Sequence, residues 1–140
     1  MEKENFTLVT KLQHDLLTAK YTEVFFVAGQ NSKSPTRFLV IKPNDDTITK
    51  LQEFSEKKAV SEAVCEINFQ DGPIKEFGVN GVMNEDLIAM VIARLEHFQT
   101  TDFKCRENAV AITKLEEALM WLRKRTVNRV NRGVEGTNKI

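Results

Sequence analysis

Three arginines near the end of the chain have a spacing that suits anion binding. Arg125, Arg129 and Arg132 follow one another at intervals of four and three residues, so a helix would present them on one face. Guanidinium groups form forked hydrogen bonds with phosphate oxygens. The alternative is that cations close to a helix C-terminus stabilise its dipole and cap its last carbonyl groups. Spacing alone leaves both interpretations open.

Two further side chains could contact a nucleotide. Asn108 offers an amide that can read a base edge or a ribose hydroxyl, and Phe98 offers a ring that can stack on a purine. Each has a plainer interpretation, because asparagine is common at helix starts and a phenylalanine at a helix end often closes a core. The residue types therefore suggest nucleotide binding without establishing it.

Signals for catalysis are missing from the sequence. It contains no glycine-rich phosphate loop and no G-x-S-x-G, C-x-x-C or H-E-x-x-H motif. The 2 cysteines, Cys65 and Cys105, have no partner at metal-binding spacing, and the 2 histidines are His14 and His97. We expect a protein that is not an enzyme, with no cofactor, no metal ion and reduced thiols in a cytoplasm.

The composition argues against nucleic acids and membranes as partners. The 20 basic and 20 acidic residues cancel, which argues against DNA or RNA as a ligand. The apolar runs Leu87–Ala93 and Val24–Ala28 are much shorter than the ~18 residues that cross a bilayer, so no membrane association is expected. The first residues do not show the charged-then-apolar pattern of an export leader, so we do not expect export. A length of 140 residues predicts a single domain over 1–140.

Residues 1–80 are mainly β-forming. Tyr21–Ala28 and Arg37–Lys42 are rich in β-branched and aromatic residues, and turn-forming residues separate them, which predicts an antiparallel hairpin. Val64–Phe69 predicts a further strand of the same sheet.

Two segments of this β-rich part are ambiguous. Phe6–Leu17 has apolar residues at helical spacing, although Phe6–Val9 also fits a strand. Asp46–Lys57 mixes β-branched residues with a weak helical pattern. The sequence decides neither segment.

Residues 84–132 predict a helical hairpin. Asn84 and the acids that follow it supply a cap and a first turn, and apolar residues then recur at helical spacing as far as Phe98. The linker Thr100-Thr101-Asp102 offers a break and a new N-cap. A second helix is expected to start near Phe103 to Cys105 and to run to about Arg132, where Gly133 stops it and residues 133–140 follow as a tail. At ~28 residues it would be roughly 40 Å long. The predicted fold is α+β, an N-terminal antiparallel sheet followed by an antiparallel two-helix hairpin.

The second helix has more apolar surface than one neighbour can cover. One seam can pack on the first helix of the hairpin: Ile112, Leu115, Leu119 and Leu122. Trp121, Val127 and Val130 extend the apolar surface beyond that seam. A second copy of the chain is the economical partner, so we expect a homo-oligomer.

The combined pattern resembles a known family. The succession Cys105-x-Glu107-Asn108, Arg125-Thr126-x-x-Arg129-x-x-Arg132-Gly133-Val134-Glu135-Gly136-Thr137, preceded by Arg94-Leu95 and Phe98, is similar to the C-terminal hairpin of phage sponge proteins that counter the Thoeris and CBASS defences. It covers about Gly72–Thr137. The length and the β-rich first half resemble the Thoeris sponges, since the CBASS sponges are shorter and mostly helical.

The resemblance implies a function. Such a protein would bind a cyclic ADP-ribose isomer, such as glycocyclic ADP-ribose, made by a host TIR-domain enzyme, and would hold it without cleaving it in the cytoplasm of the infected bacterial host. Members assemble as homo-oligomers, typically hexamers built from dimers, and some also hold cyclic di- or trinucleotides. The alternatives are a structural or regulatory phage protein that uses the hairpin only to oligomerise, and an enzyme that degrades the signal.

The same resemblance implies roles for individual residues. Phe98 would stack on the adenine, Asn108 would hydrogen-bond the base or ribose, and Arg125 and Arg129 would hold the diphosphate. Thr126 would lie where a second pocket, for cyclic oligonucleotides, could form. The N-terminal half should supply further contacts with the ligand, but it contains no motif that matches the family. Lys75 and Arg37 are its candidate contact residues.

Overall fold

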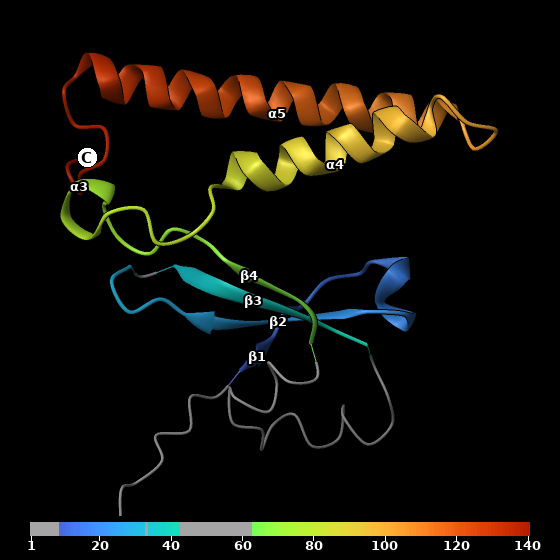
Figure 1. Ribbon diagram of the computed structural model, residues 1–140, viewed down its shortest axis with the longest axis horizontal. Helices are drawn as coiled ribbons and strands as arrows, with labels where there is room; N and C mark the ends of the chain where they lie inside the picture. Colours follow the sequence, from blue (N-terminus) through green and yellow to red (C-terminus); the bar gives the residue numbers. More distant parts are fainter. Residues whose placement is uncertain (1–8, 33, 43–62) are drawn as a thin grey trace, which may run out of the picture. The chain divides into compact units, whose positions relative to one another are not determined.

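The computed structural model describes residues 9–32, 34–42 and 63–140 (Figure 1). The chain divides into two compact units, Met1–Gly72 and Pro73–Ile140, and each is described by itself. The prediction of a single domain stays a prediction. The α+β class is confirmed, with an antiparallel sheet in the first unit and helices in the second.

The first unit is a four-stranded antiparallel sheet in the order β1-β2-β3-β4. Its strands are β1 (Thr10–Lys11), β2 (Glu23–Ala28), β3 (Pro35–Ile41) and β4 (Ala63–Asn68). The predicted hairpin and the predicted third strand are therefore confirmed. A short 3₁₀ helix, η1 (Leu17–Lys20), precedes β2.

The two ambiguous segments have different outcomes. The described part of Phe6–Leu17 contains the short strand β1 and no α-helix, so the helical interpretation of that part is wrong. Phe6–Leu8, most of the alternative strand Phe6–Val9, and all of Asp46–Lys57 lie outside the described residues.

The period of two along the strands separates two apolar faces of the sheet. One face carries a buried cluster of Phe25, Leu39 and Ile41. The opposite face carries a row of aromatic rings, in which Phe38 lies 6.1 Å from Phe26 and 5.5 Å from Phe69 between ring centroids. The rings of that row are only half-buried, in contrast to the cluster on the first face.

The second unit is the predicted helical hairpin. A short helix, α3 (Ile74–Phe77), precedes α4 (Asn84–Phe98) and α5 (Arg106–Asn131). α4 and α5 lie side by side and run in opposite directions (Figure 1). Within the parts of the chain that the structure describes, no helix is long and apolar enough to cross a membrane.

In both helices the cap residue differs from the one that the sequence predicted. Asn84 is the first helical residue rather than the cap, and the cap position is Met83, whose N–H donates to Asp86 Oδ2 at 2.9 Å. α5 starts at Arg106 with Cys105 at the cap position, later than the residues Thr100 to Asp102 that were expected to cap it. Asp86 is the third residue of α4, and its bond to the Met83 N–H is the half of a capping box that the acid supplies.

The predicted end of α5 is confirmed. Gly133 has a φ of 70°, and its N–H donates to Val130 O at 3.0 Å. The N–H of Val134 donates to Arg129 O, also at 3.0 Å, which completes the pair of hydrogen bonds that close a helix at a glycine. The chain then leaves the helix axis as the tail, residues 133–140.

α5 is a long helix with no fully buried residue. One stripe is half-buried along the hairpin, and it contains the predicted seam of Ile112, Leu115, Leu119 and Leu122. Elsewhere Trp121 and Met120 are each 70% exposed and Val130 is 57% exposed. The predicted excess of apolar surface is present, and this is the surface on which the expectation of oligomers rests.

Candidate functional site

The predicted arginine row lines one hollow on the C-terminal half of α5. The hollow has a volume of about 490 Å³, and its lining is Trp121, Lys124, Arg125, Asn128, Arg129, Arg132 and Ile140. Four of these side chains are cationic, and no acidic side chain is among the described residues that line it. Like charges gathered on one helix face repel one another, so an anion in the hollow would relieve that repulsion.

Arg129 differs from the other cations of the hollow. Its side chain is half-buried, and Nη2 donates to Val134 O at 3.1 Å and to Thr137 O at 2.9 Å. These two carbonyl groups belong to the tail and not to the last turn of α5, so Arg129 fastens the tail and does not cap the helix as the alternative interpretation supposed. The guanidinium also carries N–H donors on Nε and Nη1, so the tail bonds leave donors for an anion.

Arg125 and Arg132 are exposed on the same helix. Neither forms a salt bridge with any part of the chain that the structure describes. Their guanidinium groups are solvated, and each can form forked hydrogen bonds with a phosphate without first leaving an intramolecular partner. Arg125 and Arg132 are thus the arginines of the row for which the structure shows no side-chain partner among the described residues.

Phe98 and Asn108 lie at the loop end of the hairpin. Phe98 is the last residue of α4 and Asn108 is in the first turn of α5, and both side chains are half-buried. The Arg94 guanidinium lies 5.0 Å from the centroid of the Phe98 ring, a cation–π contact one helical turn away. The ring is therefore neither sealed in a core nor fully in water.

The two pairs of predicted ligand residues lie far apart in one chain. Along α5, Asn108 precedes Arg125 by about 26 Å and Arg129 by about 32 Å at 1.5 Å per residue. Phe98 is at the Asn108 end, because α4 ends where the loop to α5 begins. One small nucleotide cannot reach both ends of the hairpin, so a single chain brings each pair together and does not bring all four residues together.

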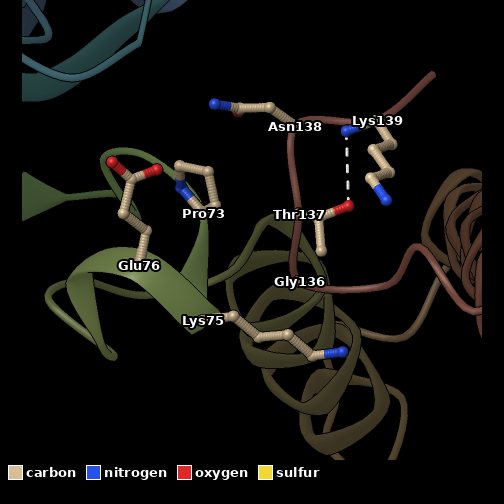
Figure 2. Close-up of a pocket in the computed structure, with 7 residues that line it drawn as sticks. All are labelled: Pro73, Lys75, Glu76, Gly136, Thr137, Asn138 and Lys139. Atoms are coloured by element: carbon tan, nitrogen blue, oxygen red, sulfur yellow. Dashed lines mark hydrogen bonds between the residues drawn. The ribbon is translucent and has the colours of Figure 1, made fainter.

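Lys75 belongs to a different hollow, between α3 and the tail. Figure 2 shows this hollow, which has a volume of about 550 Å³ and is lined by Pro73, Lys75, Glu76, Gly136, Thr137, Asn138 and Lys139. The Lys75 N–H donates to Gly136 O at 3.1 Å. A Cβ on Gly136 would lie 3.2 Å from Lys75 Cγ, so the lysine stem packs closely on the tail. Lys75 is thus placed beside the tail and outside the arginine row.

Arg37 and Thr126 are engaged within the chain. Arg37 Nε donates to Glu66 Oε1 at 2.7 Å, so this β3 arginine is neutralised by a neighbour on β4. The Thr126 hydroxyl donates to Leu122 O at 3.2 Å, the usual bond of a threonine within a helix. Neither residue lines the arginine hollow.

Gln99, at the loop end of the hairpin, could not be identified from the sequence pattern. The Gln99 side chain bonds both backbone groups of Cys105, with distances of 2.9 Å from Nε2 to O and 3.0 Å from N to Oε1. A glutamine after a helix carries no local signal for such a bond, because its partner depends on where the next helix starts.

Comparison with known proteins adds two findings. The family model described as "Acb2/Tad1, hairpin domain" matches residues 61–127. The chain is 47% identical over 139 residues to a protein of Bacillus phage SBSphiJ7 named "Thoeris anti-defense 1", and the match covers 92% of this chain and 98% of that protein. The residues of the loop end and Arg125 fall inside the region matched by the family model.

Proposed function

Because the chain belongs to the Thoeris anti-defense 1 family, we propose that it is a phage protein that blocks Thoeris immunity by sequestering a signal nucleotide. The signal is a cyclic ADP-ribose isomer, such as glycocyclic ADP-ribose, made by a TIR-domain enzyme of the host. The protein holds the nucleotide intact in the cytoplasm of the infected bacterium, so that the effector of the defence is not activated.

The observation that carries this proposal is the arginine hollow. A cyclic ADP-ribose isomer has a diphosphate, and the hollow offers Arg125 and the remaining donors of Arg129 without an opposing carboxylate among the described lining residues. Charge-assisted hydrogen bonds contribute roughly 1.5–3 kcal/mol each. Diphosphate binding accounts for a cationic hollow in a chain whose total charge is zero.

The loop end of the hairpin supplies groups that can bind the adenine and the ribose, which the arginine hollow does not. Phe98 presents a ring for the adenine, and stacking is worth about 1–3 kcal/mol per base. Asn108 presents an amide for the base edge or a ribose hydroxyl. Together with two arginines these contacts approach the ~12 kcal/mol of nanomolar binding when the site is pre-organised.

The distance between the two ends of the hairpin points to a site shared by two copies. Two α5 helices packed antiparallel would bring Phe98 and Asn108 of one copy to Arg125 and Arg129 of the other. Such a pair is two-fold symmetric and therefore has two equal sites. The exposed Trp121 and Val130 on α5 supply apolar surface for this contact. We propose a homo-oligomer assembled from such dimers, with a hexamer as the final state.

Sequestration requires that the site does not catalyse. The described residues contain no group of three or more His, Cys, Asp or Glu side chains that could hold a metal ion. His97 adjoins Phe98 in the sequence, but neighbouring residues on a helix point about 100° apart. The site we propose therefore contains binding groups and no base placed to activate water.

Recovery of the nucleotide after binding tests the proposal. Protein is incubated with excess glycocyclic ADP-ribose, freed of unbound nucleotide, and heated, and the released nucleotide is analysed by chromatography and for activation of a Thoeris effector. A sequestering protein returns active, unchanged nucleotide at about one equivalent per protomer. Linear ADP-ribose in excess of one equivalent per protomer, counted over the bound and the removed unbound fractions together, would identify an enzyme. A chain that binds nothing would be a structural or regulatory protein.

Cyclic di- and trinucleotides are a second proposed class of ligand, also by family membership. Thr126 was the residue suggested for them, and its hydroxyl is bonded within α5. A hydroxyl oxygen that donates to a carbonyl group can still accept a hydrogen bond. Competition between a cyclic trinucleotide and glycocyclic ADP-ribose would show whether the two ligands share a pocket.

A further inference from the structure

A single side chain joins the two helices at the loop end of the hairpin. Gln99 occupies the C-cap position of α4 and Cys105 the N-cap position of α5. The Gln99 amide donates to the Cys105 carbonyl oxygen and accepts from the Cys105 N–H, at 2.9 and 3.0 Å. The end of one helix is thereby fixed to the start of the next.

The other polar side chains of the loop do not make this connection. The hydroxyl groups of Thr100 and Thr101 donate to carbonyl groups of His97 and Phe98, at 2.7 and 2.6 Å, and the Thr101 hydroxyl also accepts from the Phe103 N–H at 3.2 Å. These bonds stay within the end of α4 and the loop and do not reach α5. Among the described residues of this loop, Gln99 and Cys105 form the side-chain link between α4 and α5.

The link lies between the two residues proposed to read the nucleoside. Phe98 directly precedes Gln99, and Asn108 is three residues beyond Cys105. Arg94 covers one face of the Phe98 ring, so the opposite face is the one left for a base. Fixing the backbone on both sides of the loop therefore fixes the ring and the amide relative to each other.

We propose that Gln99 is a positioning residue for the nucleotide site. Its paired hydrogen bonds hold the Phe98 ring and the Asn108 amide in their binding arrangement before the ligand arrives. Without them the loop must be ordered during binding, and the entropy lost in that ordering weakens affinity. This inference rests on the proposed function.

The replacement Gln99→Glu gives a test that a general loss of structure would not mimic. An ionised glutamate cannot donate to the Cys105 carbonyl group and repels it, whereas a protonated glutamate reproduces both hydrogen bonds of the glutamine. The ordinary pKa of a glutamate carboxyl is about 4.3, so the protonated fraction of this side chain increases as the pH falls towards that value. The defect should therefore diminish as the pH falls.

The measurement is calorimetric titration with glycocyclic ADP-ribose at pH 7.5 and pH 5. At pH 7.5 we expect Gln99→Ala and Gln99→Glu to bind about tenfold more weakly than wild type, or about 1.4 kcal/mol. At pH 5 the defect of Gln99→Glu relative to wild type should be smaller than at pH 7.5, whereas the defect of Gln99→Ala should be the same at both pH values. Lys104→Ala, an exposed change in the same loop, is the control and should match wild type at each pH value.

Each other outcome overturns the inference. Binding of both Gln99 variants with wild-type affinity would refute the positioning role alone. Weak binding accompanied by dissociation in light scattering, or by a large fall in Tm, would identify Gln99 as a general structural residue. Failure of the wild type to bind glycocyclic ADP-ribose would refute the proposed function, and the positioning role with it.

Discussion

Arg129 and Thr137 are joined by a hydrogen bond of 2.9 Å, from guanidinium Nη2 to the threonine carbonyl oxygen. The same nitrogen also donates to Val134 O at 3.1 Å. The arginine that family resemblance assigns to the diphosphate is therefore also the residue that holds the tail against the end of α5. Arg125, one turn earlier, has no such task, so replacing the two arginines should have different consequences.

Replacing Arg129 should reduce both stability and affinity. Arg129→Lys keeps the charge but loses the planar group that reaches two tail carbonyls. We expect the free energy of unfolding to fall by about 1–2 kcal/mol, with Tm falling in calorimetry, and affinity for glycocyclic ADP-ribose to fall as well. An unchanged Tm would show that the tail does not depend on these hydrogen bonds.

Replacing Arg125 should reduce affinity alone. Arg125→Lys preserves the charge on an exposed side chain and removes the forked geometry, so binding should weaken about tenfold while Tm stays at the wild-type value. Lys124→Ala, in the same hollow, is the control and should have little effect on binding. Wild-type affinity in both the Arg125 and Arg129 lysine variants would refute the diphosphate assignment.

Assembly should depend on the exposed apolar surface of α5. Trp121 is 70% exposed in the single chain, so Trp121→Glu should leave the hairpin folded and prevent copies from associating, since association would bury an unpaired charge. Leu119→Glu should damage the hairpin as well, because Leu119 lies in the half-buried seam. Light scattering measures the mass and circular dichroism the helix content. A wild type that is a stable monomer at micromolar concentration would contradict this prediction.

Mixing two inactive variants should restore binding if the sites are shared. Phe98→Ala and Arg125→Ala should each abolish high-affinity binding in a homodimer. In a mixed dimer one of the two sites has an intact Phe98 and an intact Arg125, so random mixing should restore about a quarter of the sites. Titration after unfolding and refolding the mixture together counts them. No recovery, with mixed dimers present, would place each site within one chain.

Much of the hairpin could be predicted from the sequence because its signals are local. The apolar spacing up to Phe98 and the glycine at 133 fix where α4 and α5 end, and the structure confirms both. The starts were less predictable, since methionine is not a typical cap residue and the backbone N–H of Met83 is bonded by the Asp86 carboxylate three residues later. The strands of the β2–β3 hairpin were equally local, whereas the two-residue β1 depends on its pairing with β2.

The site was only partly predictable. Helical spacing placed Arg125, Arg129 and Arg132 on one face, and the structure gathers them in one hollow. Spacing could not show that Arg129 bonds the tail, because the tail folds back after a bend at Gly133. Nor could it show that Gln99 meets Cys105, since that contact depends on the path of the whole loop.

The distance between Asn108 and Arg125 has a consequence for timing during infection. If each nucleotide site needs both ends of two hairpins, newly made protomers are inactive until they meet. The number of working sites then rises with the square of the protein concentration at first, rather than in proportion to it. A weak promoter would leave the signal free even when many protomers are present, so rapid early expression would be as important to protection as the affinity of each site.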